Sequence, residues 1–148
     1  MCIRDSHCYK INSAVLSSDG DTLLTAGSDG STMLWDISSG DCIRTFGEVC
    51  SWSNCADLSR DGKFVIALGI SGHEEIAVLW QACTGEVSQR FQNPSGAVLC
   101  VALSSDSQFA LTGGRDGRVR IWNTFSGDCA EVLRSSVFFG VTAATFAI

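Results

Sequence analysis

The sequence has few basic residues, a single proline and no long apolar run. Lys and Arg total 10 against 16 Asp and Glu, which gives a formal net charge of −6. A protein that binds a nucleic-acid backbone or an anionic membrane surface needs clustered Lys and Arg, whereas here they are scattered along the chain. We therefore expect neither nucleic acid nor a membrane as a partner.

Targeting segments are also missing from the sequence. No apolar run approaches the ~18–20 residues that a helix needs to span a bilayer. The first ten residues, MCIRDSHCYK, contain no apolar segment of the kind found in a secretory signal peptide. These absences favour a cytoplasmic protein, and they leave a nuclear location open.

The eight cysteines form no Cys-x-x-Cys pair, and only two histidines, His7 and His73, could join them as metal ligands. We therefore expect no zinc site and no cofactor. Cys42 and Cys129 occupy the same place in two copies of an SGDC motif. A disulfide framework is one interpretation of so many cysteines in a short chain, but the missing export signal favours reduced thiols.

What the sequence does contain is a repeat. Residues Leu24 to Asp36 read LTAGSDGSTMLWD, in which a Ser-Asp-Gly turn joins two short apolar runs, a pattern typical of a β-hairpin. Leu111 to Asn123 read LTGGRDGRVRIWN, and Ile66 to Gln81 give a looser copy. The tryptophans of the three copies, Trp35, Trp80 and Trp122, are 45 and 42 residues apart.

Each copy also has a turn before the hairpin and another after it, which predicts four short antiparallel strands per copy. The composition, 45% hydrophobic and 18% charged, is globular, and 15 glycines suit many tight turns. In the second copy the middle turn, Gly69 to Glu75, is longer than in the others. The expected strands lie around 11–16, 22–26, 31–37 and 42–46; around 52–58, 64–68, 76–80 and 87–91; and around 98–103, 109–112, 119–122 and 129–133.

A period of about 40–45 residues with a Trp-Asp signature resembles the WD40 repeat family. The resemblance implies an all-β fold: a partial β-propeller of four-stranded antiparallel blades arranged as an open arc. The predicted divisions are repeats at 7–47, 48–92 and 93–134, and the start of a further repeat at 135–148. Residues 1–6 are either the last strand of a preceding blade or a remnant foreign to the native chain. We expect a fragment of a larger protein.

The resemblance also implies a buried hydrogen-bonded set of His, Ser or Thr, Asp and Trp in each blade. The second copy keeps only Trp80, with Ala67 at the Ser/Thr position and Glu74 near the Asp position. Asn93-Pro94 stands where the third copy would have Gly-His. The matched residues are His7, Thr25, Asp29 and Trp35 in the first copy and Thr112, Asp116 and Trp122 in the third.

A His with an Asp and a Thr also suggests a catalytic triad, but the repeat spacing explains these residues as a structural set. No nucleophile motif such as G-x-S-x-G, phosphate-binding loop or pair of catalytic carboxylates is present. We expect no enzymatic activity and no catalytic residue in this chain.

The resemblance predicts a scaffold that presents loops to partner proteins and that needs further blades, or self-association, to cover its open blade faces. Trp52 is either an exposed anchor for a partner or packs under the long middle turn, and the Glu74–Glu75 pair is either part of the face or a solvated turn. Two alternatives remain: a regulatory or substrate-recognition part of a multidomain enzyme, such as a nucleotide-driven switch or a ubiquitin-ligase subunit, and a purely architectural arc. The candidate partner-binding face comprises Tyr9, Lys10, Glu48, Trp52, His73, Glu74, Glu75 and Arg115.

Overall fold

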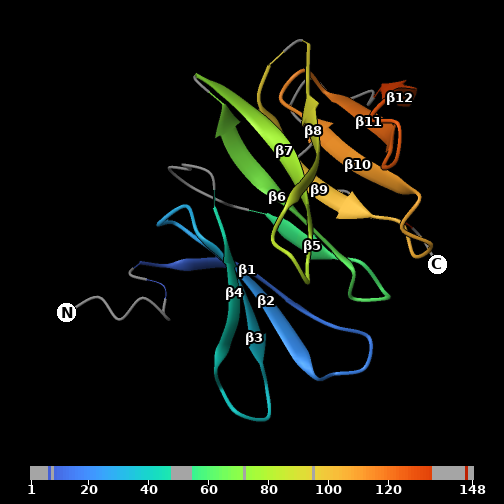
Figure 1. Ribbon diagram of the computed structural model, residues 1–148. Helices are drawn as coiled ribbons and strands as arrows, with labels where there is room; N and C mark the ends of the chain where they lie inside the picture. The colour runs from blue at the N-terminus through green and yellow to red at the C-terminus, as the bar shows by residue number, and fades with distance from the viewer. Residues whose placement is uncertain are drawn as a thin grey trace.

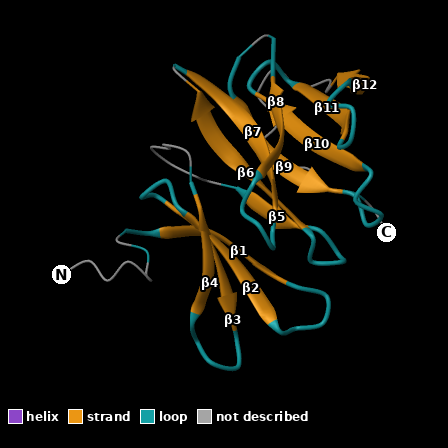
Figure 2. Cartoon of the chain, in the orientation of Figure 1, coloured by secondary structure: helices purple, strands orange, loops and turns teal. Residues whose placement is uncertain are grey.

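The computed structural model describes residues 7, 9–47, 55–71, 73–94, 96–134 and 146. These residues form twelve strands and no helix, in three four-stranded antiparallel sheets (Figures 1 and 2). The first sheet has the order β1-β2-β3-β4, the second β5-β6-β7-β8 and the third β9-β10-β11-β12. Each sheet is therefore a meander, and none closes into a barrel. This confirms the prediction of an all-β chain of four-stranded blades in an open arc.

The strands follow the turn signals of the sequence closely. The first sheet contains β1 (Ile11–Leu16), β2 (Thr22–Gly27), β3 (Thr32–Asp36) and β4 (Cys42–Phe46). The second contains β5 (Ala56–Leu58), β6 (Phe64–Ser71), β7 (Glu74–Gln81) and β8 (Val87–Gln92). The third contains β9 (Val98–Leu103), β10 (Phe109–Gly114), β11 (Arg118–Asn123) and β12 (Cys129–Arg134).

The long middle turn expected at Gly69 to Glu75 is wrong. Gly69 pairs with Ile76, Ile70 with Glu75 and Ser71 with Glu74, so β6 and β7 continue as a hairpin through most of this segment. The two strands have eight residues each, against five or six in the hairpins of the other sheets. Added residues in register extend a ladder, since each pair satisfies the backbone groups that a loop would expose to water.

The sheets lie side by side with their first strands toward a common centre, where β1 contacts β5 and β5 contacts β9 (Figure 1). Two apolar cores fill the spaces between them. One joins Leu24, Leu34 and Phe46 of the first sheet to Trp80 of the second. The other joins residues of the second sheet, including Phe91, to Trp122 of the third. Each core therefore belongs to two sheets, as expected when a single blade cannot bury both of its faces.

An aromatic pair recurs at both interfaces. Phe46 of β4 packs against Trp80 at 5.8 Å between ring centroids, and Phe91 of β8 packs against Trp122 at 5.4 Å. Both pairs are tilted, which suits the ring quadrupoles. Trp80 is 4% exposed and Trp122 is 8% exposed. Trp35 is only half-buried, because among the described residues it packs against His7 at 6.3 Å and no preceding sheet supplies an aromatic partner.

The two ends of the sheets differ in which segments meet there. At one end, which we call the loop edge, the segment before an inner strand meets the middle turn: Ser28 N–H donates to Lys10 O, and Arg115 N–H to Ala97 O. At the opposite end, the turn edge, the first and third turns meet: Ile37 N–H donates to Asp21 O, and Thr124 N–H to Gln108 O. The same backbone bonds thus give the first and third sheets one loop edge and one turn edge each.

Candidate functional site

A chain of hydrogen bonds fastens the first sheet below its loop edge. Trp35 Nε1–H donates to Thr25 Oγ1 at 2.8 Å, and Thr25 Oγ1 lies 2.6 Å from His7 Nε2. His7 Nδ1 lies 3.2 Å from Asp29 Oδ1. These contacts fit one tautomer, in which the Thr25 hydroxyl donates to Nε2 and Nδ1–H donates to Asp29. Ser31 adds a hydroxyl bond to Asp29 Oδ1 at 2.7 Å.

The burial of these side chains shows whether the hydrogen-bonded set could act on a substrate. The His7 side chain is 3% exposed, Thr25 is 4% exposed, and the Asp29 side chain is 14% exposed. The Thr25 oxygen already accepts the indole proton, so it is not presented to a substrate as a nucleophile. Gly27 allows the close packing, since a Cβ there would lie 2.5 Å from His7 Nδ1 and 2.6 Å from Asp29 Oδ1. The geometry is that of a hydrogen-bonded set that holds the strands and the middle turn of the first sheet together.

The third sheet has a related set with different members. Trp122 Nε1–H donates to Thr112 Oγ1 at 2.9 Å, and Thr112 Oγ1–H donates to Asn93 Oδ1 at 3.3 Å. Asn93 therefore takes the place of His7 toward the threonine. Asp116 instead forms an ion pair with Arg120, whose Nη2 lies 2.7 Å from Asp116 Oδ2. The Arg120 side chain is 4% exposed, so this is a buried ion pair.

Sequence reasoning missed both Asn93 and Arg120 as members of this set. The signal for Asn93 was present: it precedes Thr112 by 19 residues, while His7 precedes Thr25 by 18. An asparagine carboxamide presents an acceptor and a donor side by side, as an imidazole does. Arg120 gave no such signal, because its counterparts Met33 and Val78 are apolar.

The second sheet replaces the polar set by apolar packing. Ala67 supplies no hydroxyl at the position of Thr25, and Trp80 packs against Phe46. Glu74 lies in strand β7 opposite Ser71, and its carboxylate accepts a hydrogen bond from Gln92 Nε2. Spacing alone aligned Glu74 with Asp29, whereas the longer hairpin places it on the strand outside any such set.

The loop edge carries the described members of the candidate partner-binding face. Tyr9 is 73% exposed. A hollow of about 280 Å³ lies between the end of the β6–β7 hairpin and the loop before β9, lined by His73, Glu74, Glu75, Asn93, Pro94, Gly96 and Ala97. The exposed members of the face are Tyr9, Lys10, His73, Glu74, Glu75 and Arg115. Glu48 and Trp52 lie outside the described residues.

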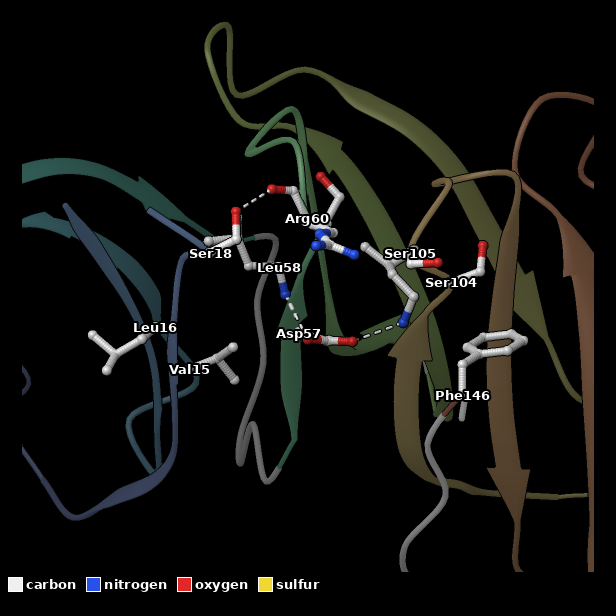
Figure 3. Close-up of a pocket in the computed structure, with 11 residues that line it drawn as sticks. Val15, Leu16, Ser18, Asp57, Leu58, Arg60, Ser104, Ser105 and Phe146 are labelled. Atoms are coloured by element: carbon white, nitrogen blue, oxygen red, sulfur yellow. Dashed lines mark hydrogen bonds between the residues drawn. The ribbon is translucent and has the colours of Figure 1, made fainter. Parts of the chain in front are cut away.

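A second hollow, of about 450 Å³, opens at the turn edge between the ends of the three inner strands (Figure 3). Its walls include Val15, Leu58, Arg60 and Phe146 (Figure 3). Asp57 Oδ1 accepts a bond from Leu58 N–H at 2.9 Å and Oδ2 accepts one from Leu103 N–H at 2.8 Å. Burial raises the pKa of the Asp57 carboxyl above its ordinary value. Asp57 thus joins the inner edges of β5 and β9.

The described residues contain no group of three or more His, Cys, Asp or Glu side chains placed to hold a metal ion. Within the same residues, no helix is long and apolar enough to cross a membrane. Five cysteines are described as free thiols: Cys42, Cys55, Cys83, Cys100 and Cys129. Cys55 Sγ lies 3.5 Å from both Val101 N and Val101 O, and burial raises the pKa of its thiol. This thiol adds a second link between β5 and β9.

Comparison with known proteins agrees with this architecture. The WD domain, G-beta repeat model matches residues 1–36 and 85–123, just over half of the chain. The two matched segments end at equivalent points, directly after Trp35 and Trp122. The Periodic tryptophan protein 2 homolog of Dictyostelium discoideum is 40% identical over 45 residues, which are 30% of this chain and 5% of that protein. With its three meander sheets and this match, the chain belongs to the WD40 repeat family.

Proposed function

We propose that this chain is a non-catalytic scaffold that binds partner proteins through its loop edge. The observation that carries the proposal is the contrast between buried and exposed polar groups. The residues that resemble catalytic groups, His7, Thr25 and Asp29, bond to one another in the interior. The exposed aromatic and charged residues of the face, including Tyr9 and Arg115, gather at the loop edge instead. Exposed side chains beside a hollow favour recognition over chemistry.

We also propose that the chain is part of a longer protein. WD40 repeats work as arrays in which each blade covers its neighbours, and propellers commonly have about 4–8 blades. The structure describes three sheets. The matched relative is far longer than the segment it shares with this chain. The activity and partners of such a longer protein are not carried over from that relative.

Site-specific photo-crosslinking tests the binding proposal. Two exposed aromatics give a matched pair: Tyr9 at the loop edge is 73% exposed, and Phe125 at the turn edge is 72% exposed. A photoreactive phenylalanine analogue is placed at one position or the other and the protein is irradiated in cells. We expect discrete crosslinked partner bands from position 9 and none from position 125. Equal labelling at both positions, or labelling at position 125 alone, would contradict the proposal.

A further inference from the structure

Four of the ten basic residues of this acidic chain lie within one corner of the third sheet. Arg115 is in the turn between β10 and β11, Arg118 and Arg120 are in β11, and Arg134 ends β12. Three of them are close together in the sequence, whereas Arg134 lies further along the chain. Antiparallel pairing of β11 with β12 brings them together at the loop edge.

Arg118 and Arg134 are direct cross-strand partners. Opposite residues on one face of an antiparallel pair have Cβ atoms about 4.5–5.5 Å apart, and like charges there are destabilising. The corresponding pair in the second sheet is Ile76 and Gln92, which carries no charge. The two arginines therefore weaken the ladder that holds them, and a purely structural role does not account for the pair.

The nearby carboxylate does not neutralise this pair. Asp116 is engaged by the Arg120 guanidinium, at 2.7 Å and 3.4 Å, and by Arg118 N–H at 3.1 Å. Across the described ranges, no carboxylate forms an ion pair with the side chain of Arg118 or Arg134. Arg134 is exposed and Arg118 is half-buried. Among the residues that the structure describes, neither of these two guanidinium groups therefore has an acidic partner.

A hollow of about 220 Å³ lies here, lined by Asp116, Gly117, Arg118 and Arg134. We propose that this hollow binds a phosphate group carried on a side chain of a partner protein. A phosphorylated side chain has a charge of about −1.5 to −2 and three acceptor oxygens, enough to engage two guanidinium forks at once. A single carboxylate has less charge and fewer oxygens to share between them. The inference rests on the proposed scaffold function, whose partners it would specify.

Fluorescence anisotropy of the purified chain with a fluorescein-labelled Gly-Gly-phosphoSer-Gly-Gly peptide tests the inference. We expect the unphosphorylated peptide to bind at least about tenfold more weakly, since charge-assisted bonds to phosphate are lost. The double variant Arg118→Gln, Arg134→Gln should lose the preference for phosphate. Its melting temperature should be equal to or higher than that of the parent, because the change removes a like-charge pair. The control Arg60→Gln, at the turn edge, should bind as the parent does.

Three results would overturn the inference: equal affinity for both peptides, an unchanged preference in the double variant, or loss of the preference in Arg60→Gln. Inorganic phosphate that competes as well as the phosphopeptide would indicate a site for the free ion, and tighter binding of a single-stranded oligonucleotide would indicate a nucleic-acid surface. Either would also contradict it. Crosslinking from position 9 does not depend on the arginines, so a positive crosslink with a negative titration would remove this inference and leave the scaffold function standing.

Discussion

At the scale of single residues, one threonine hydroxyl links the hydrogen-bonded set of the first sheet, and another links that of the third sheet. Thr25 connects Trp35 to His7, and Thr112 connects Trp122 to Asn93. Thr25→Val and Thr112→Val keep the shape of the side chain but remove the oxygen. The buried Trp122 N–H and the half-buried Trp35 N–H then lose their acceptors, so each variant should lose about 1–3 kcal/mol of unfolding free energy. Denaturant titration measures this loss.

Thr45→Val is the matched control, because Thr45 is an exposed strand residue. Its unfolding free energy should change by less than about 0.5 kcal/mol. If all three variants lost the same amount, the indole bonds would have no special weight. If Thr25→Val alone lost unfolding free energy, the bond between Thr25 and His7 would account for the loss, and the bond from the indole would not.

Asp29 and Glu74 provide a second comparison, since spacing aligns them and the structure separates them. Asp29 Oδ1 accepts bonds from Ser31 N–H, from the Ser31 hydroxyl and from His7. Asp29→Ala leaves these donors without an acceptor and should cost about 1–3 kcal/mol of unfolding free energy. Glu74→Ala, at an exposed strand position, should cost less than about 0.5 kcal/mol. Equal denaturant midpoints for the two variants would show that the hydrogen bonds of Asp29 have no special part in stability.

The residue scale shows where sequence reasoning succeeds and where it stops. The spacing from Thr25 to Trp35 recurs from Thr112 to Trp122, and both pairs are hydrogen-bonded. A repeat fixes such spacings because cross-strand neighbours are set by the hairpin turn. The Asp116–Arg120 pair follows from no repeat, because it depends on one substitution at a position that is apolar in the other sheets. The repeat spacing predicts contacts that recur between repeats, but it does not predict contacts that occur in only one repeat.

At the scale of strands and sheets, an aromatic on the last strand of one sheet covers the tryptophan of the next. Phe91 is fully buried and Phe46 is 2% exposed. Phe46→Ala and Phe91→Ala should each lower the unfolding free energy by about 3–5 kcal/mol, through lost burial and the cavity that remains. Thermal or denaturant unfolding measures the change.

Leu133 is the control within the same register, since it pairs with Val119 as Phe91 pairs with Ala77. It is 46% exposed, because the described part of the chain places no further sheet against it. Leu133→Ala should therefore cost less than about 1 kcal/mol. A loss as large as that of Phe91→Ala would show that the third sheet is already covered on this side.

The first turn of each sheet gives a prediction about acid. The Ser17 hydroxyl lowers the pKa of Asp19, and the Ser104 hydroxyl lowers that of Asp106, with backbone N–H groups of Asp21 and Gln108 adding to the effect. A carboxyl with a lowered folded pKa stabilises the protein above its unfolded value, and this stability is lost as the pH falls through the folded value. The double variant Asp19→Asn, Asp106→Asn should therefore show a flatter loss of unfolding free energy below the ordinary carboxyl pKa of 3.8. An unchanged acid slope would contradict this.

Asp57 should respond to acid with the opposite sign. Burial raises its pKa, so the folded chain takes up this proton more readily than the unfolded chain does. Its contribution to stability is present at low pH and is lost as the pH rises through the raised value. As the pH rises above 3.8, the unfolding free energy of Asp57→Asn should therefore fall less than that of the parent. This result would distinguish the Asp57 carboxyl from the carboxyls of the turns.

Turn chemistry explains why the strand order was predictable and one hairpin was not. The Ser-x-Asp-Gly turns place Gly20 and Gly62 at φ of 79° and 70°, a conformation that glycine adopts readily. Ser107 occupies the same position at φ of 62°, so the third turn keeps the conformation without the glycine. In the second hairpin a Gly follows β6 directly, but Gly69 is also typical of a turn, so the sequence offers more than one place for the strand to end. The length of that hairpin depends on cross-strand pairing, which a local pattern does not encode.

At the scale of the whole molecule, the three sheets formed by the described residues make two interfaces and leave two outer faces. The interior interfaces join Phe46 to Trp80 and Phe91 to Trp122. On the outer faces Trp35 is half-buried, Leu16 is 63% exposed and Leu133 is 46% exposed. Repeat proteins gain most of their burial from neighbours, so the end units of an array need a cap or a partner. The same pattern that predicts the blades from sequence predicts these faces.

The purified chain should therefore associate with itself at low micromolar concentration. Each outer face presents apolar side chains that an adjoining sheet covers elsewhere in the molecule, and burying them removes apolar area from water. Multi-angle light scattering should show a mass above that of the monomer that falls on dilution. Leu16→Glu and Leu133→Glu should each shift the protein toward monomer, since association would bury an unpaired charge. Phe125→Ser, which removes a still more exposed apolar side chain from a turn, should leave the mass unchanged. A clean monomer with a single cooperative melt would instead show that three sheets suffice without any neighbour.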